Sequence, residues 1–278
     1  MPLEDELSDI IKKARLGRQR SVAEVARAAG LVEEDLAELE RGRAPSGAAQ
    51  VASVAKALGL KPDALVEVAQ GWTPEAQPAS TAHVETVLGS IGGYEVKGYV
   101  VHDRGEAILV DTAYNPDAML ALLTSRQLTL RAICLTHGHS DHAEGIERIL
   151  RTRPVPVYLG PEDLNLLHWR PPQDILQVPR NGESLQVGGL TVRFMTTPGH
   201  TPGGICYRAE QAGQPLCFVG DTLFAGSIGR SNPAGLYAAH LDSVRRQVLT
   251  LEADTRLHPG HGPSTTVREE LVHNPFAA

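Results

Sequence analysis

The spacing of apolar residues changes near residue 70, and this change divides the chain into two regions. From residue 7 to about 69, apolar residues recur every three or four positions among helix-forming Ala, Leu, Glu, Lys and Arg, which predicts a small bundle of helices. From residue 83 onward, short apolar runs separated by Gly-rich turns alternate with helical patterns, which predicts an α/β domain. The Pro-containing stretch between them has no periodicity and predicts a linker. The predicted domains are residues 1–70 and 83–278, with the linker at 71–82.

The N-terminal region contains two short helical patterns joined by a glycine. Ser21 is placed to cap a helix over residues 22–29, Gly30 ends that helix, and a second helix over residues 32–40 ends at Gly42. Two short helices joined in this way form a helix-turn-helix. The segments that resemble the Cro/repressor type of helix-turn-helix are residues 21–26, 29–31, 39–45 and 51–60. This resemblance implies a small all-α module with a DNA-reading fold.

The charge of this module disfavours DNA as its partner. Residues 1–70 hold ten Lys and Arg against twelve Asp and Glu, and the helix expected to read DNA starts with Glu33, Glu34 and Asp35. Phosphates would repel these carboxylates. One basic cluster could follow a phosphate backbone or form a solvated face; it comprises Lys12, Lys13, Arg15, Arg18 and Arg20. The alternatives to DNA binding are a homodimer formed through this module, a docking role and a vestigial one.

The composition predicts a cytoplasmic protein. The formal net charge is −7, and 42% of the 278 residues are hydrophobic, which suits a globular chain with a large core. The three cysteines lie far apart in apolar runs without a CxxC pair, as expected for core residues in a reducing compartment. The sequence shows no signal-like segment and no apolar run of membrane-spanning length. We therefore predict no membrane partner.

The segment with the clearest chemical signal is residues 136–142, which read Thr-His-Gly-His-Ser-Asp-His. An apolar run at 132–135 precedes it and a helical pattern at 143–150 follows it, so a buried strand is expected to deliver this loop. Three imidazoles and a carboxylate suit zinc and the neighbouring first-row metals. Asp111, at the end of another predicted strand, either supports such a site from behind or is an ordinary turn residue.

Three further loops follow strand-like runs and carry a histidine or an aspartate among Gly and Pro. They are residues 197–204 with His200, residues 220–230 with Asp221, and residues 256–263 with His261. Neither a helix nor a central strand forms readily through such turns. Loops at strand ends can converge on one end of a sheet, and a carboxylate such as that of Asp221 could bridge two cations.

The four loops carry HxHxDH, GHTPG, GDTLF and PGHGP in this order, and together they resemble the metallo-β-lactamase superfamily. The resemblance implies an αββα sandwich, in which two sheets pack face to face between helices, and two divalent metal ions per chain, zinc first with iron or manganese as alternatives. The ligands that it implies are His137, His139 and His200 on one metal, Asp141, His142 and His261 on the other, and Asp221 bridging them. Asp141 and Asp221 are the implied catalytic residues. The histidines that match no ligand position, and that are predicted to be surface or core residues, are His83, His102, His168, His240, His258 and His273.

Within the superfamily, residues 220–231 and 259–266 look like the glyoxalase II-like branch, which hydrolyses thioesters such as S-lactoylglutathione. A hydroxide held between two metals would attack the thioester carbonyl. The sequence departs from that branch at residues 232–235 and in lacking its C-terminal helical domain, so other small thioesters or esters are candidate substrates too. The alternative functions are a mononuclear iron persulfide dioxygenase, which resembles glyoxalase II, and a transcription regulator whose metal domain senses a ligand.

Overall fold

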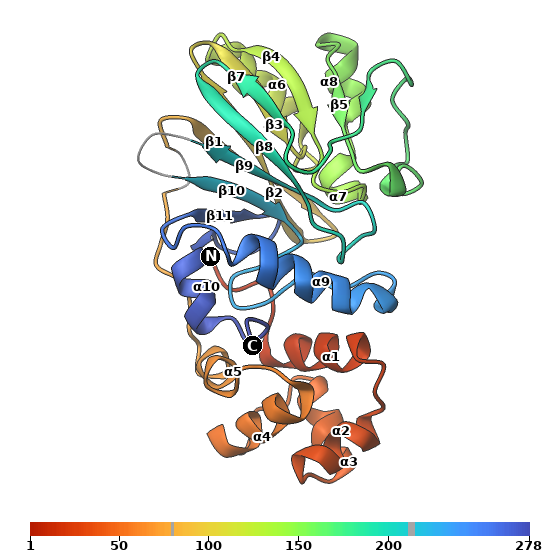
Figure 1. Cartoon of the computed structure of the whole chain (residues 1–278), viewed down its shortest axis with the longest axis vertical. Coiled ribbons are helices and arrows are strands. Elements are labelled where there is room, and N and C mark those ends of the chain that lie inside the picture. Colours follow the sequence, from red (N-terminus) through yellow and green to blue (C-terminus); the bar gives the residue numbers. More distant parts are fainter. Residues whose placement is uncertain (79–80, 211–214) are drawn as a thin grey trace.

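The computed structural model describes residues 1–78, 81–210 and 215–278, and it contains two six-stranded sheets packed face to face (Figure 1). The first sheet has the order β1-β2-β3-β4-β5-β6. Its strands are β1 (Val84–Ile91), β2 (Tyr94–Asp103), β3 (Glu106–Val110), β4 (Thr129–Cys134), β5 (Val157–Tyr158) and β6 (Leu176–Gln177). The second sheet has the order β12-β11-β10-β9-β8-β7. Its strands are β7 (Ser184–Val187), β8 (Leu190–Thr196), β9 (Ile205–Glu210), β10 (Leu216–Gly220), β11 (Arg256–Pro259) and β12 (Thr265–Thr266).

Helices cover the outer face of each sheet, so the predicted αββα sandwich is confirmed (Figure 1). The first sheet is covered by α6 (Pro116–Ser125) and α8 (Ile146–Thr152), and the short α7 (Ser140–Ala143) lies between these two helices in the sequence. The second sheet is covered by α9 (Tyr237–Ser243), its π-helical continuation η3 (Val244–Val248) and α10 (Val267–His273). Two short 3-10 turns are η1 (Pro161–Asp163) and η2 (Ala234–Leu236).

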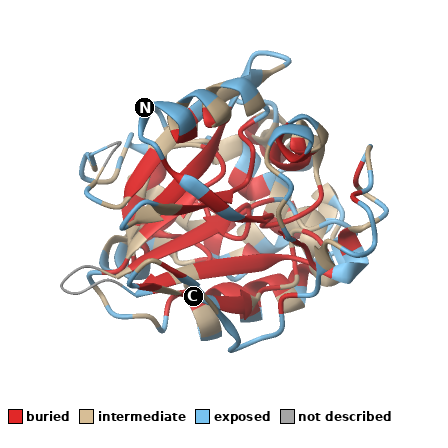
Figure 2. Cartoon of the chain, turned by 90° about the horizontal axis from the view of Figure 1, so that it is seen from above, coloured by how far each residue is buried: buried red, intermediate tan, exposed pale blue. Residues whose placement is uncertain are grey.

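The strands form the buried centre of the molecule, as Figure 2 shows by colour. One apolar cluster fills the space between the two sheets and includes Val101, Val110, Val192 and Phe218, all 3% exposed or less. This arrangement follows from the sequence, because residues that alternate along a strand point to opposite faces, and both faces of these strands are covered. The sheets are therefore a rigid base from which the loops at the strand ends project.

The predicted N-terminal helices are also confirmed. They are α1 (Leu7–Gly17), α2 (Val22–Ala29), α3 (Glu33–Glu40), α4 (Ala48–Leu58) and α5 (Pro62–Ala69). The Ser21 side chain accepts a hydrogen bond from the Glu24 backbone N–H and caps α2, while Gly30, with a φ of 70°, closes it in the left-handed conformation. None of the helices in the described part of the chain combines the length and apolar character needed to cross a lipid bilayer.

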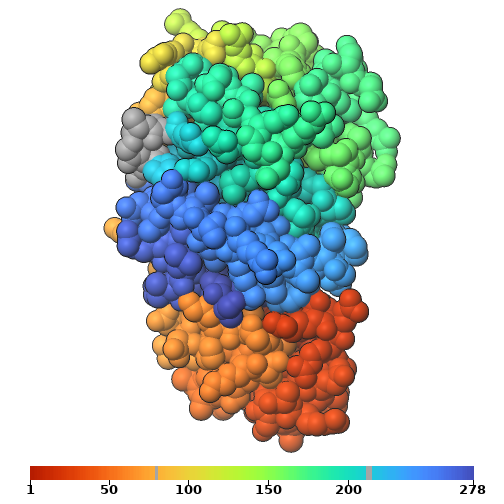
Figure 3. Space-filling model, viewed as in Figure 1, coloured from red at the N-terminus to blue at the C-terminus, as the bar shows by residue number. Residues whose placement is uncertain are grey.

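These helices pack directly against α9 and α10, as Figure 3 shows for the red and orange segments below the blue ones. One continuous apolar cluster joins Ile10 and Leu65 of the N-terminal helices to Tyr237 and Phe276. The fit is close, because a Cβ added to Gly17 would lie 2.3 Å from the Tyr237 ring.

The described residues of the predicted linker form neither helix nor strand, but part of the segment is packed against the rest of the chain. The Trp72 ring stacks on His273 with centroids 4.7 Å apart, so this end of the linker is packed against α10. Ala79 and Ser80 lie outside the described residues.

Most of the basic cluster on and after α1 serves contacts within the chain. Arg15 forms a two-pronged ion pair with Glu40 at 2.5 and 2.7 Å, and Arg20 donates to the Ala57 carbonyl at 2.8 Å. Arg18 lies over the Tyr237 ring, and Lys13 donates to Asp5 and to the Ile228 carbonyl. Lys12 is exposed and, within residues 1–78, 81–210 and 215–278, makes no such contact.

Candidate metal centre

The seven candidate ligands come together because their loops all leave the carboxyl ends of strands at one edge of the sandwich. In the first sheet, β3 and β4 are parallel with Val110 opposite Cys134, so the residues that follow each strand lie side by side. In the second sheet, β10 and β11 are also parallel, and they deliver Asp221 and His261. His200 follows β8. Ligand-binding residues of α/β proteins commonly gather at such an edge.

The candidate ligand atoms form overlapping groups that could each hold a cation. Within each group the atoms lie within 4.8 Å of one another. The groups are His137, His139 and His200; His137, Asp141 and His142; and His142, Asp221 and His261. Because His137 and His142 each belong to two groups, the cluster is one centre with room for more than one ion.

The separations between these atoms fit metal coordination. His200 Nε2 lies 3.0 Å from His139 Nδ1, and His142 Nε2 lies 3.4 Å from His261 Nε2 and 3.3 Å from Asp221 Oδ1. Two ligand atoms about 2.0–2.1 Å from a tetrahedral zinc are separated by roughly 3.3 Å. The buried Nε2 of His137 has no hydrogen-bond partner in the described part of the chain, and an unpaired buried nitrogen is costly unless it has a ligand.

The Nδ1 atoms of three of these imidazoles, which point away from the cluster, form hydrogen bonds with surrounding groups. These bonds fix the orientation of the rings. The Nδ1–H groups of His200 and His261 donate to the carbonyls of Arg230 at 2.8 Å and Glu95 at 2.7 Å. The Nδ1–H of His142 donates to Asp111 at 2.9 Å. These bonds leave each Nε2 as the lone-pair nitrogen that faces the cluster, a common arrangement around protein-bound zinc.

Asp111 lies directly behind the cluster and is 1% exposed. Its Oδ1 accepts from the Thr136 backbone N–H at 2.7 Å, and its Oδ2 accepts from the Thr136 hydroxyl at 2.8 Å and from His142. Since the Thr136 hydroxyl donates to Asp111, it accepts from the Nδ1–H of His137, 3.0 Å away. Asp111 thereby orients two imidazoles, one directly and one through Thr136.

Burial and neighbouring charges set the protonation of the cluster. Burial lowers the pKa of His200 to about 4 and places that of His137 well below its usual value, so both imidazoles are neutral at pH 7. For Asp221, burial opposes ionisation, but His142 and His261 together bring its pKa well below the usual value. For His142 and His261, burial opposes protonation, but neighbouring carboxylates, chiefly that of Asp221, outweigh it and raise the pKa. Because metal binds neutral imidazoles and ionised carboxylates, a cation at these two residues would displace their protons.

Two residues without a predicted role in the site hold the ligand loops together. Asp163, fully buried in η1, accepts from the backbone N–H groups of Gly138 and Gly203 and from the Thr201 hydroxyl. It ties the His137 loop to the His200 loop. Burial raises its pKa. Nothing in the local sequence distinguishes this aspartate from an ordinary helix-start residue.

His240 is the second of these residues, and it belongs to α9. Its Nε2–H donates to the Thr222 carbonyl at 2.8 Å, and its Nδ1 accepts from the Ser231 hydroxyl at 3.1 Å. A Cβ on Gly199 would lie 2.3 Å from the His240 Cα, so the His200 loop rests against it. Burial lowers the pKa of His240 to about 3. The sequence predicts a surface or core residue here, and His240 is a core residue that also positions two ligand loops.

The remaining histidines lie outside the cluster. His258, which is 3% exposed, stacks on Phe218 with ring centroids 5.1 Å apart and meets the edge of Tyr99 at 5.2 Å. Its Nε2 has no partner in the described part of the chain. The others are the fairly exposed His168 and the partly buried His83, His102 and His273.

We expect replacement of His258 by Phe to flatten the dependence of stability on acid pH. Burial lowers the pKa of His258 to about 3, against about 6.5 in an unfolded chain. Because the folded state favours the neutral ring, its contribution to stability is complete above pH 6.5 and declines as the pH falls toward 3. At pH 5 the loss is about 2 kcal/mol. Urea unfolding at pH 7 and pH 5 measures it, with His168→Phe as the exposed control, and equal losses in wild type and His258→Phe would contradict the expectation.

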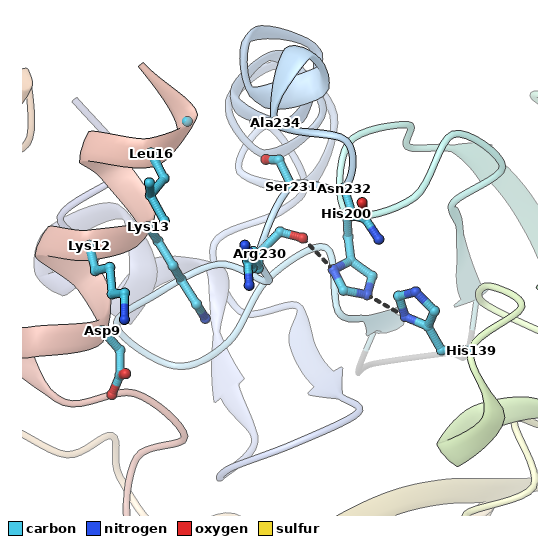
Figure 4. A pocket seen from close by; sticks show the side chains of 11 residues that line it. Asp9, Lys12, Lys13, Leu16, His139, His200, Arg230, Ser231, Asn232 and Ala234 are labelled. Carbon is cyan, nitrogen blue, oxygen red and sulfur yellow. Dashed lines mark hydrogen bonds between the residues drawn. The ribbon is translucent and has the colours of Figure 1, made fainter. Parts of the chain in front are cut away.

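A cavity of about 570 Å³ opens onto the cluster and connects it to the N-terminal helices (Figure 4). On one side are the imidazoles of His139 and His200, and on the other is α1 with Lys12 and Lys13. Arg230 lies between them. The cavity is large enough for a small molecule with one end at the cluster and the other at α1.

The αββα sandwich and the histidine–aspartate cluster at its strand ends define a class of metal-binding α/β proteins, generally hydrolases. The sequence model of the Metallo-beta-lactamase superfamily matches residues 91–261, and the chain belongs to this superfamily. The predicted membership is confirmed. The N-terminal helices lie outside the matched residues.

Named relatives are similar to the sandwich over most of their own length. Rv2581c of Mycobacterium tuberculosis is 33% identical over 203 residues, covering 64% of this chain and 91% of its own. Hydroxyacylglutathione hydrolase GloC of Haemophilus influenzae is 29% identical over 189 residues, covering 63% of this chain and 88% of its own. About a third of this chain therefore has no counterpart in either protein.

Solved structures give the same result. The B3 metallo-beta-lactamase BLEG-1 is 30% identical with a TM-score of 0.62 and covers 70% of this chain and 99% of its own. TTHA1623 in a di-iron-bound form is 32% identical with a TM-score of 0.58 over 68% of this chain and 99% of its own. ETHE1 from Myxococcus xanthus is 25% identical with a TM-score of 0.58, covering 69% of this chain and 84% of its own.

Proposed function

We propose that the protein is a metal-dependent thioesterase that hydrolyses small thioesters of the hydroxyacylglutathione type. The observation that carries this proposal is the meeting of five imidazoles and two carboxylates beside a cavity of about 570 Å³. The similarity to a hydroxyacylglutathione hydrolase supports the choice of substrate class. In the reaction, water adds its oxygen to the carbonyl carbon, the carbon–sulfur bond breaks, and the sulfur leaves as a thiol.

We assign the ligands to two cations as the spacing suggests. His137, His139 and His200 would hold the first, Asp141, His142 and His261 the second, and Asp221 both. Asp221 suits the shared position because its carboxylate oxygens lie 3.3 Å from His142 Nε2, 3.5 Å from His200 Nε2 and 3.7 Å from His261 Nε2. Zinc fits this donor set, and iron and manganese are alternatives.

When bound, the cations supply a hydroxide at neutral pH and polarise the thioester carbonyl. The chain's own residues would position the reactants. Asp141 is the more accessible of the two carboxylates, with 23% of its side chain exposed against 9% for Asp221. It would accept a hydrogen bond from the attacking water and orient it toward the carbonyl. The Asp111 and Thr136 contacts would keep His137 and His142 in their ligating tautomers.

Removal of metal tests this proposal directly. We expect protein purified without added metal to contain divalent metal and to hydrolyse S-lactoylglutathione. Stripping with a chelator should lower kcat/KM by at least about 100-fold, because water is then no longer activated. Returning zinc, manganese or iron separately should restore activity and identify the cation. Elemental analysis and loss of thioester absorbance are the measurements, and full activity in metal-free protein would refute the proposal.

The second candidate function is oxygenation of a persulfide with a single iron. It is favoured by the similarity to ETHE1 from Myxococcus xanthus and by the first ligand group, which could hold one cation alone. One iron per chain and oxygen uptake on glutathione persulfide, without thioester hydrolysis, would select this function. Two metals per chain and hydrolysis without oxygen uptake would select the thioesterase.

A further inference from the structure

The N-terminal helix α1 forms the wall of the cavity opposite the candidate metal cluster. The residues of α1 that line the cavity are Asp9, Lys12, Lys13, Leu16 and Gly17. The far side is formed by His139 and His200, and Arg230 lies between the two sides (Figure 4). Ser231 and Asn232 also line the cavity. α1 lies outside the residues matched by the superfamily model, so this wall is a feature of this chain and not of the matched sandwich.

The wall is held in place by contacts to the ligand-bearing loop. Asp5, just before α1, accepts a hydrogen bond from the Ser227 hydroxyl at 2.5 Å and pairs with Lys13. Lys13 also donates to the Ile228 carbonyl at 3.0 Å and lies over the Phe224 ring. Since residues 224–228 follow Asp221 in the same loop, α1 keeps a fixed distance from the cluster. Lys13 is therefore a structural residue of the wall.

The positive charges left for a ligand are those of Lys12 and Arg230. Both side chains are exposed, and neither makes a side-chain hydrogen bond or ion pair within the described residues. The acidic side chain in the lining is Asp9, and it accepts the Glu6 backbone N–H in the capping box of α1. The Arg230 carbonyl accepts a hydrogen bond from His200, and the Arg230 side chain extends from there toward α1 (Figure 4).

We propose that Lys12 of α1 and Arg230 bind a carboxylate or phosphate on the non-reacting thiol part of the substrate, while the carbonyl lies at the metal cluster. The N-terminal helices thus contribute substrate specificity, and the substrate class is that of anionic thioesters. This inference rests on the proposed function for the place of the carbonyl. Two cations that line one partly enclosed cavity attract an anion more strongly than exposed charges do on a flat surface.

Binding of thioethers, which cannot be hydrolysed, tests the anion site without relying on activity. The probes are S-hexylglutathione with free carboxylates, its dimethyl ester, and S-hexyl-coenzyme A as the phosphate-bearing alternative. Calorimetric titration should show an anionic probe binding about tenfold more tightly than the dimethyl ester, with the preference weakening at high salt. The tighter anionic probe tells whether the site prefers a carboxylate or a phosphate. Equal affinity for all three probes would overturn the proposal.

Substitutions assign the preference to the two residues. Lys12→Gln and Arg230→Gln should each lower the preference for the anionic probe by about five- to tenfold, and Lys12→Arg should retain most of it. Lys56→Gln, at an exposed lysine of α4 that does not line the cavity, is the matched control and should change nothing. A preference that both variants leave intact would overturn the proposal, as would an equal loss for charged and uncharged probes.

Hydrolysis assays separate this inference from the proposed function. If the wild-type protein binds anionic probes through Lys12 and Arg230 but hydrolyses no thioester, the anion site stands and the thioesterase proposal fails. If it hydrolyses charged and uncharged thioesters with the same kcat/KM in wild type and both variants, the thioesterase stands and the anion site fails. Melting temperature and metal content, measured for each variant, show that a change in binding does not come from a loss of fold.

Discussion

Replacing Asp221 with Ala is expected to abolish metal loading and thioester hydrolysis together. Asp221 is 7% exposed, and its carboxylate lies against three imidazoles from three different loops, those of His142, His200 and His261. Without it, two neighbouring cations would face each other with no negative charge between them. We expect metal content to fall below one ion per chain and kcat/KM to fall by about three orders of magnitude, because the nucleophile and the carbonyl lose their activation together.

A matched variant makes this result specific. Asp254→Ala removes a carboxylate that is 80% exposed and pairs with Arg268 at the surface, and it should leave metal content and kcat/KM near the wild-type values. Elemental analysis and steady-state kinetics on both variants, together with melting temperatures, give the comparison. An Asp221→Ala protein that retained two metals and full activity would show that the cluster is not the reaction centre.

The fold was predictable where the spacing of apolar residues within one segment distinguishes a helix from a strand. The change from helical to strand spacing near residue 70 placed the helices and the sheets correctly. A single helix over residues 143–150 was wrong, because the chain forms α7 and α8 with a break at Gly145. Gly145 has a φ of 90° and lies against the Pro116 ring. That conformation depends on a contact with a distant part of the chain, and the local spacing of apolar residues does not indicate it.

The candidate ligands were predictable because each lies in a loop that follows an apolar strand. Strand ends in an α/β sandwich share an edge, so His137, His200, Asp221 and His261 could be brought together without knowing the exact topology. The supporting residues were not predictable in this way. Asp163 forms hydrogen bonds to residues 25 and 40 positions away in the chain, and His240 to residues 9 and 18 positions away. A single buried polar residue of this kind leaves no pattern in the sequence.

The position of the N-terminal helices was the feature least accessible to sequence. A Pro-containing segment predicted a linker between separate units, yet Trp72 stacks on His273 and Gly17 lies beneath Tyr237. Such contacts depend on how two surfaces meet, and the helical pattern on each side shows only that an apolar face exists. The same packing brings Lys12 to the cavity, although the sequence first suggested a DNA contact for that residue.

Replacing Asp111 with Asn is expected to weaken metal binding about 10- to 100-fold with little change in melting temperature. Asn adopts the left-handed conformation readily, so the φ of 57° at this position is preserved. The Thr136 backbone N–H, fixed 2.7 Å from Oδ1, requires the amide oxygen at that position. The amide NH2 group then faces His142 Nδ1, 2.9 Å from the Oδ2 that it replaces.

Two donors cannot share that contact, so His142 must move its proton from Nδ1 to Nε2. An Nε2–H cannot ligate a cation, and the second metal would lose one of its imidazoles. Competition with a chromophoric chelator measures the affinity, and activity should recover in part at saturating metal because the remaining ligands are intact. Asp103→Asn is the matched control, since Asp103 lies 3.3 Å from His83 Nδ1 in a pair outside the cluster. Wild-type metal affinity in Asp111→Asn would show that the tautomer of His142 is set by something other than Asp111.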